Sequence, residues 1–184
     1  MVADILPKVV RGEVTIALGM SEPEAGSAVT ELVTSARLEG DEVVVNGSKV
    51  FSTHSPDASV FLIYVRFGPG VDGIGSVLIE RGTPGFSIGE PSSFMSGEQW
   101  CQLYFENCRI PASQVLLGIG GFKKQIAGFN VERLGNASRS LALGLHLALW
   151  RRRLNLAVRP QDWWHLPRAE LAAMALPEGS SLLQ

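Results

Sequence analysis

The chain has 184 residues, a formal net charge of −2 and 46% hydrophobic residues. A chain of this length buries a sizeable core without disulfide staples, and its ordinary apolar fraction excludes wholesale disorder. The balance of 16 basic against 18 acidic residues supplies no positive field that would favour a nucleic-acid partner.

The N-terminal segment and the cysteines give expectations about location. Residues 1–11 contain Asp4 and Pro7 and no long apolar run, so we expect no signal peptide and, along the whole chain, no membrane span. Cys101 and Cys108 match no zinc or redox spacing, and we interpret them as small core residues of a reduced, cytoplasmic protein. No metal site is predicted, because the three histidines lie far apart.

Residues 13–117 have the texture of a β-rich domain, with short apolar runs between turn signals. The first run covers residues 14–18, and residues 32–38 alternate imperfectly. The pair Asn46-Gly47 then stands between two β-prone runs, which predicts a hairpin because a type I′ turn needs positive φ at both central positions. The runs that flank this pair are residues 43–45 and 49–53.

Later runs extend the same pattern. Residues 60–67 are dense in β-branched and aromatic side chains, as in a buried strand, and residues 76–80 and 102–106 follow. Gly-Pro-Gly, Asp-Gly and Thr-Pro-Gly sequences punctuate the region. Short strands at this regular spacing predict a β-barrel or a sandwich.

The pattern changes at Gly118-Ile119-Gly120-Gly121, which lacks the third glycine of a dinucleotide fingerprint and is interpreted as a β-to-α connector. Side chains then recur at helical spacing, which predicts one amphipathic helix that reaches about Trp150. These positions are Phe122, Ile126, Phe129, Arg133, Ala137, Leu141 and Leu145. The predicted fold class is α+β, mainly a β-barrel followed by a long α-helix.

The segment after the first run allows two interpretations. Ser21 and Glu24 have capping-box spacing and Pro23 stands early in the turn, which predicts a capped loop. Alternatively, Gly26 adopts a positive φ and Ser27 presents its hydroxyl and its N–H, so that exposed donors meet an anionic or carbonyl-rich ligand.

The pair Glu132-Arg133 lies inside the predicted helix and also allows two interpretations. Helix neighbours do not face each other, so the two side chains pair poorly. They are either two charges on a solvated edge, or they include a carboxylate at the wall of a site. In the second case burial raises the carboxylate pKa towards roughly 6–7 and makes it a general base.

Several segments occur in one order along the chain: Met20-Ser21-Glu22-Pro23-Glu24-Ala25-Gly26-Ser27, Asn46-Gly47-Ser48-Lys49-Val50-Phe51-Ser52-Thr53, Phe105-Glu106-Asn107-Cys108-Arg109-Ile110-Pro111, Gly121-Phe122 and Glu132-Arg133. Together they resemble the flavin-dependent acyl-CoA dehydrogenases over about residues 10–148. That family has an N-terminal helical domain, a middle β-barrel and a C-terminal four-helix domain. The resemblance implies a middle β domain at residues 1–121 and the start of an incomplete helical domain at residues 122–150. Residues 151–184 look unlike the family, and we interpret them as a divergent, non-native tail.

The resemblance implies FAD as cofactor and oxidation of the α,β bond of an acyl-CoA thioester, in which a glutamate removes the α-proton and the β-hydrogen leaves as hydride to flavin N5. Phe51 stands where the family usually has a tryptophan that packs on the flavin. The matched FAD positions are Leu18, Met20 and Ser21 at a strand end, Gly26 and Ser27 in the turn beside the pyrophosphate, and Phe51, Ser52 and Thr53 beside the ring. The matched substrate positions are Ser27 and Arg133.

The catalytic base has two candidate positions. Glu132, immediately before Arg133, matches a subset of the family similar to the isovaleryl and long-chain enzymes, and we hypothesise that it is the base. The alternative is a glutamate of the family's C-terminal domain, outside this sequence. The resemblance also implies an electron-transferring flavoprotein or a similar acceptor, and a homo- or hetero-oligomer. Two other functions stay open: a non-catalytic flavin-domain remnant acting as an interaction module, and a flavin oxidase or monooxygenase of the same fold.

Overall fold

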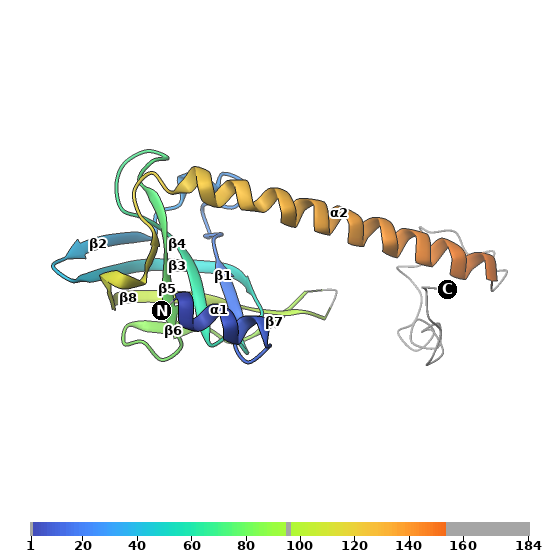
Figure 1. Ribbon diagram of the computed structural model, residues 1–184, viewed down its shortest axis with the longest axis horizontal. Helices are drawn as coiled ribbons and strands as arrows, with labels where there is room; N and C mark the ends of the chain where they lie inside the picture. Colours follow the sequence, from blue (N-terminus) through green and yellow to red (C-terminus); the bar gives the residue numbers. More distant parts are fainter. Residues whose placement is uncertain (1, 95–96, 154–184) are drawn as a thin grey trace. The chain divides into compact units, whose positions relative to one another are not determined.

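The computed structural model describes residues 2–94 and 97–153, and Figure 1 shows their course. The chain divides into two compact units between Phe129 and Asn130, and each unit is described by itself. The first unit begins with the short helix α1 (Val2–Val10), which was not expected from the sequence. From position 154 onward, the predicted divergent tail lies outside the described residues.

The strands of the first unit form one sheet. Their bounds are β1 (Ile16–Gly19), β2 (Ser35–Glu39), β3 (Glu42–Thr53), β4 (Val60–Arg66), β5 (Ile74–Glu80), β6 (Phe86–Ile88), β7 (Ser92–Ser93), β8 (Gln99–Pro111) and β9 (Val115–Leu117). The main path runs β6-β8-β3-β2-β4-β5-β9, while β1 pairs with β4 in parallel and β7 pairs with β8. The 3-10 turns η1 (Val29–Glu31) and η2 (Ala112–Gln114) lie between strands.

One core joins strands from distant positions on this path, so the sheet curls back over itself. Val77 of β5 and Phe105 of β8 share a buried cluster, although β4, β2 and β3 separate their strands on the path. In β4, Phe61 and Ile63 enter the same cluster, whereas Tyr64 on the opposite face enters a second one. A strand buried on both faces explains the dense apolar run at this position. The predicted barrel-like β fold is confirmed.

The hairpin predicted at Asn46-Gly47 is wrong. Strand β3 runs unbroken through both residues, and the chain turns instead at Gly40, which has a φ of 63°. Gly47 is needed for a different reason, because a Cβ added there would lie 2.6 Å from Thr34 Oγ1. A bulge at this point shifts the register against β8, and Asn46 Oδ1 accepts a hydrogen bond from the Asn107 N–H at 2.8 Å. The glycine therefore marks a close approach between backbone segments rather than a turn.

The helix predicted after the glycine connector is confirmed as α2 (Phe122–Arg153), but over its whole length it is not amphipathic as expected. Its first turns belong to the first unit, where Phe122 is buried and Ile126 and Phe129 pack against the cluster that contains Tyr64. Five large apolar side chains between positions 130 and 145 are between 59% and 77% exposed. These residues are Val131, Leu134, Leu141, Leu143 and Leu145. Among the described residues, no helix has the length and apolar character needed to cross a membrane.

Both cysteines are free thiols buried in β8, which confirms their interpretation as small core residues. Burial raises the pKa of the Cys108 thiol to about 11. This thiol therefore stays protonated and unreactive near neutral pH.

Candidate functional site

The segment after β1 forms a tight turn. Glu22 and Ala25 exchange both of their backbone hydrogen bonds, at 3.0 and 3.2 Å, with Pro23-Glu24 at the centre. The capping-box interpretation is wrong, because the next helical turn is η1 and its preceding residue makes no side-chain capping bond. Gly26 and Ser27 follow the turn and are exposed, as the alternative interpretation requires, although Gly26 does not take the expected positive φ.

A buried ion pair fastens this turn to the sheet. Lys49 Nζ on β3 lies 2.7 Å from Glu22 Oε1, and the two side chains are 0% and 2% exposed. The carboxylate also accepts hydrogen bonds from the N–H groups of Val33 at 2.6 Å and Thr34 at 2.9 Å. The ammonium donates a further bond to the Met20 carbonyl at 3.2 Å. The pair thus joins the turn, β3 and the backbone that leads into β2.

The two main motifs of the sequence meet at this point. The Val50 N–H donates a hydrogen bond to the Ser21 carbonyl at 2.9 Å, directly beside the ion pair. Residues 20–27 are therefore joined to β3 at Lys49 and Val50, which directly precede the last strand residues Phe51, Ser52 and Thr53. We call this place the turn–strand junction. Residues far apart in sequence share it because the Ser21–Val50 hydrogen bond and the ion pair bring them together.

Both members of the ion pair are charged near neutral pH. Burial lowers the pKa of Lys49 from 10.5 to about 8, while its hydrogen bond to Glu22 acts in the opposite direction. For Glu22, burial acts to raise the pKa, but hydrogen bonds from Lys49, Thr34 and Val33 outweigh it and keep the pKa below its ordinary value. Removing one partner would leave the other as an uncompensated buried charge, which is strongly destabilising.

Near the end of β3, the aromatic side chain of Phe51 is exposed and its backbone is strained. The register against β8 shifts between Lys49 and Ser52, and Phe51 within this bulge has a φ of 56°. A bulky residue in this left-handed region costs about 1–3 kcal/mol and persists only where its surroundings over-determine it. Here the rings of Trp100 and Phe94 flank it, with centroids 4.7 and 6.4 Å away. Phe51 is nevertheless 56% exposed, so its ring is free to pack on a planar ligand.

Hydroxyl groups surround the same strand end. Ser52 is buried, and its Oγ has no hydrogen-bonding partner among the described residues. Thr53 is half-buried at the last position of β3. The backbone beneath them is held firmly, because Ser55 Oγ donates to the Ser52 carbonyl at 2.6 Å and accepts the Cys101 N–H at 2.9 Å.

The remaining predicted site residues lie in two places. Leu18 and Met20 are half-buried and pack against the cluster that contains Tyr64. Glu132 and Arg133 lie on α2 in the second unit, and both are exposed. Arg133 Nη1 donates a hydrogen bond to Asn130 Oδ1 at 3.0 Å.

The sequence analysis did not predict the ion pair, although both residues stand inside quoted motifs. A usable signal was present. Lys49 has the same strand parity as Val43 and Val45, so period-2 alternation directs it towards the core. A buried lysine requires an acidic partner, and Glu22 stands in the turn that the other motif forms.

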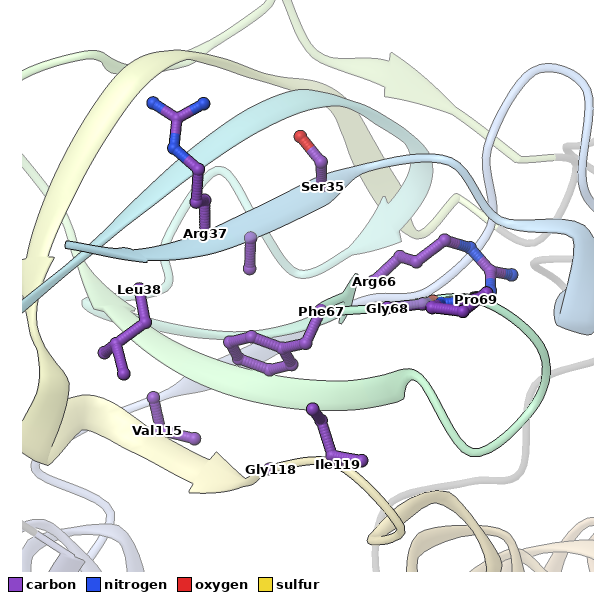
Figure 2. A pocket seen from close by; sticks show the side chains of 11 residues that line it. Ser35, Arg37, Leu38, Arg66, Phe67, Gly68, Pro69, Val115, Gly118 and Ile119 are labelled. Carbon is purple, nitrogen blue, oxygen red and sulfur yellow. Dashed lines mark hydrogen bonds between the residues drawn. The ribbon is translucent and has the colours of Figure 1, made fainter.

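A separate, open cavity of about 740 Å³ lies between β2, the end of β4 and the link from β9 to α2. Figure 2 shows Leu38, Phe67 and Val115 around its apolar floor, whereas Arg37 extends away from them. Its lining residues are Ser35, Ala36, Arg37, Leu38, Arg66, Phe67, Gly68, Pro69, Val115, Gly118 and Ile119. Arg66 already binds the carbonyls of Leu32, Thr30 and Gly70 at 2.8, 2.6 and 2.7 Å. The cavity includes no residue of the turn–strand junction.

The curled sheet around one buried cluster defines a barrel-like β domain, and comparisons with known proteins identify its family. The profile of the acyl-CoA dehydrogenase middle domain matches residues 17–108. Isovaleryl-CoA dehydrogenase from Pongo abelii is 37% identical over 145 residues, covering 75% of this chain and 34% of that protein. The chain belongs to the acyl-CoA dehydrogenase family.

Solved structures agree with this assignment. A putative acyl-CoA dehydrogenase from Mycobacterium smegmatis superposes with a TM-score of 0.76 at 28% identity, over 94% of this chain and 47% of that one. A structure described as the FAD complex of PigA superposes with a TM-score of 0.61 at 33% identity, over 65% of this chain and 32% of that one. The chain spans about a third of the length of the curated relatives that it matches.

The residues of the turn–strand junction fit a flavin. An isoalloxazine ring is planar and apolar on its faces, with polar atoms along its edges. The junction offers an exposed aromatic face at Phe51, donors at Ser27 and Thr53, and the orphaned hydroxyl of Ser52. This donor set matches a planar, acceptor-rich ligand.

Proposed function

We propose that this protein takes part in FAD-dependent α,β-dehydrogenation of an acyl-CoA thioester, and that the turn–strand junction is its flavin site. The observation that supports this most strongly is the fastening of residues 20–27 to the end of β3 by the Glu22–Lys49 pair and the Ser21–Val50 hydrogen bond. Family membership supplies the reaction class. When bound, FAD would supply the redox chemistry by accepting the β-hydrogen as hydride at N5.

The chain's own residues bind and orient the reactants. Ser21, Ser27 and Thr53 present donors to the flavin edge and pyrophosphate, and Gly26 leaves room because no described atom lies within 4 Å of a Cβ built there. Phe51 packs on the ring. Hydrogen bonds of this kind are individually worth about 1 kcal/mol, but together they fix the orientation in which hydride transfer proceeds.

Proton removal falls to Glu132 in this proposal. Glu132 is exposed on α2, and its place immediately before Arg133 supports this assignment. Its carboxylate takes the α-proton, and Arg133 contacts the substrate. The competing proposal places the base in a part of the family's C-terminal domain outside this sequence.

The partners follow from the same reaction. The substrate is an acyl-CoA, and the isovaleryl-CoA dehydrogenases among the relatives support a short, branched chain as the first probe. The electrons pass to an electron-transferring flavoprotein or a similar acceptor. The working enzyme is an oligomer, in which neighbouring chains complete the site.

The test is single-turnover bleaching of the flavin. The full chain is saturated with excess FAD, made anaerobic and mixed with isovaleryl-CoA, and the flavin absorbance is followed with time. We expect slow bleaching that Glu132→Gln reduces at least about 100-fold, since general base catalysis contributes on that order. Glu132→Gln leaves the FAD affinity unchanged.

Bleaching at the original rate in Glu132→Gln would assign the base elsewhere. Asn136→Gln, on the same helix, is the control for a substitution that leaves the proposed chemistry intact. Admission of oxygen after bleaching separates two functions. Rapid reoxidation by oxygen favours an oxidase, whereas reoxidation only by an electron-transferring flavoprotein favours a dehydrogenase.

A further inference from the structure

The Glu22–Lys49 pair is a fully buried ion pair at the turn–strand junction, and it also hydrogen-bonds to surrounding backbone. Replacing such a pair by apolar side chains is often neutral for a fold, so burial alone does not explain its presence. Besides the bond between the two side chains, the pair makes three hydrogen bonds to backbone beside the turn–strand junction. Their partners are the Val33 N–H, the Thr34 N–H and the Met20 carbonyl.

We propose that Glu22 and Lys49 are positioning residues for the flavin site: their ion pair fixes the 20–27 turn against the end of β3 so that both segments bind the cofactor together. This inference rests on the proposed flavin function of the junction. Neither side chain is available to the ligand, because both are buried and their polar groups bind each other and nearby backbone. They act through the backbone of Met20 and through the turn that Glu22 begins.

The geometry explains why charge is used. One carboxylate accepts three bonds, from Lys49 Nζ at 2.7 Å, Thr34 N–H at 2.9 Å and Val33 N–H at 2.6 Å. A neutral amide at position 22 has one acceptor oxygen, and its NH₂ group would face the Val33 N–H or the ammonium. Charge-assisted bonds are also shorter and about twice as strong as neutral ones. Only a carboxylate therefore holds the turn, the lysine and the approach to β2 at once.

The pair is also the main polar tie between these segments. Thr34 Oγ1 donates to the Ser48 carbonyl at 3.2 Å, and the Val50 N–H donates to the Ser21 carbonyl at 2.9 Å. Both of these neutral bonds flank the ion pair. Loss of either charge therefore removes the charged bond at the centre of the junction. The Thr34–Ser48 and Val50–Ser21 hydrogen bonds remain, and these neutral bonds are weaker.

The first experiment measures amide hydrogen exchange in the full chain without added FAD. In Glu22→Gln and in Lys49→Met, we expect the amides of Val33, Thr34 and Val50 to exchange at least about 10-fold faster, because local opening becomes easier. Amides of β4 and β5 keep their protection. Ile79→Ala is the matched control, since it destabilises the core at a fully buried position of β5, a strand that does not pair with β3.

The second experiment measures FAD affinity of the same variants by titration. We expect the FAD dissociation constant to rise at least about 10-fold in Glu22→Gln and Lys49→Met and to stay unchanged in Ile79→Ala while each chain is folded. The double variant Glu22→Gln/Lys49→Met separates positioning from stability. It recovers the denaturation midpoint lost in Lys49→Met, because no unpaired charge is left, but it keeps the weakened FAD affinity.

The outcomes of these experiments test the positioning inference and the proposed flavin function separately. Unchanged exchange at Val33, Thr34 and Val50 overturns the inference, whatever the FAD affinity. Faster exchange with unchanged FAD affinity also overturns it, since the pair then serves the fold alone. Failure of the unaltered chain to bind FAD overturns the proposed flavin function instead, and the exchange data still decide whether the pair fixes the turn. If Lys49→Met does not fold, the isosteric Glu22→Gln carries both measurements.

Discussion

At the scale of single residues, Lys49 shows how a charge is kept in a core. Its side chain is fully buried, and desolvation lowers its pKa to about 8. The native state therefore releases this proton at a lower pH than the unfolded chain, where the pKa is ordinary. Between about pH 8 and pH 10.5 the unfolded state binds more protons, so the free energy of unfolding rises with pH in that window.

The lowered pKa of Lys49 has a measurable effect on stability at alkaline pH. We expect the unfolding free energy of the unaltered chain to gain up to about 1.4 kcal/mol per pH unit from this group, the value for one proton. Urea denaturation at several pH values between 8 and 10.5 measures it, with Lys49→Met as reference. The contribution is absent in that variant. Parallel pH profiles for the two proteins would contradict the assignment of the lowered pKa to Lys49.

Glu22 affects the free energy of unfolding at low pH. Its pKa is held below the ordinary value, because hydrogen bonds from Lys49, Thr34 and Val33 outweigh the burial that acts to raise it. A carboxyl with a lowered native pKa contributes stability above its unfolded pKa and loses it as the pH falls through the native value. Acid therefore weakens the hold of Glu22 on the turn only as the pH falls through this lowered native pKa.

Residue identities predicted part of the candidate site. The motifs around Ser21, Ser27 and Thr53 indicated which segments to examine, and the structure joins two of these segments at the Ser21–Val50 bond. The Phe51 bulge was not predictable, because a register shift depends on the partner strand rather than on local sequence. The capping-box spacing was misleading for a similar reason. The carboxylate of Glu22 accepts its bonds from Val33 and Thr34, outside the turn. No helix begins in the turn itself, since the next helical turn starts only at Val29.

At the scale of elements, the second unit exposes a row of apolar side chains on α2. Val131, Leu134, Leu141 and Leu145 follow heptad-like spacing and are 77%, 70%, 75% and 59% exposed. Such a row on one side of a helix is typical of an association surface. Exposed apolar residues of this kind drive self-association unless another segment covers them.

We therefore expect the purified chain to self-associate and the double variant Leu134→Glu/Leu141→Glu to weaken association at least about 10-fold. Both positions are exposed, so the variant keeps its fold. Sedimentation velocity over a concentration series measures the change. Asn136→Glu introduces the same charge on another side of α2 and should leave association unaltered. An equal effect of both variants would show that added charge, not the row, controls association.

The elements were predictable where periodicity was strong. The long helix and the dense run of β4 appear as expected, since 3.6-residue and fully buried patterns extend over many positions. The prediction of a hairpin at Asn46-Gly47 was wrong because Gly47 is required by its close contact with Thr34. Turn statistics use only the local sequence and carry no information about such a tertiary contact. The short strands β6, β7 and β9 carry too few residues for any periodic signal.

At the scale of the whole molecule, the well-packed first unit contrasts with the short length of the chain. The first unit has a continuous core and a well-fastened junction, yet the chain spans about a third of the length of its curated relatives. A flavin at the junction would meet Phe51, Ser52 and Thr53 on one side. We expect the remaining contacts to come from segments outside this chain, so FAD binds weakly and is lost during purification.

The most direct test of the central claim is an FAD titration of the full chain, followed by flavin fluorescence and calorimetry. We expect saturable, one-to-one binding that Thr53→Val weakens about 5- to 10-fold, as loss of one hydrogen bond predicts. Ser87→Ala, an exposed hydroxyl on β6, should leave the affinity unchanged. Absence of saturable binding, or equal affinities for Thr53→Val and Ser87→Ala, would contradict the placement of the flavin at the turn–strand junction.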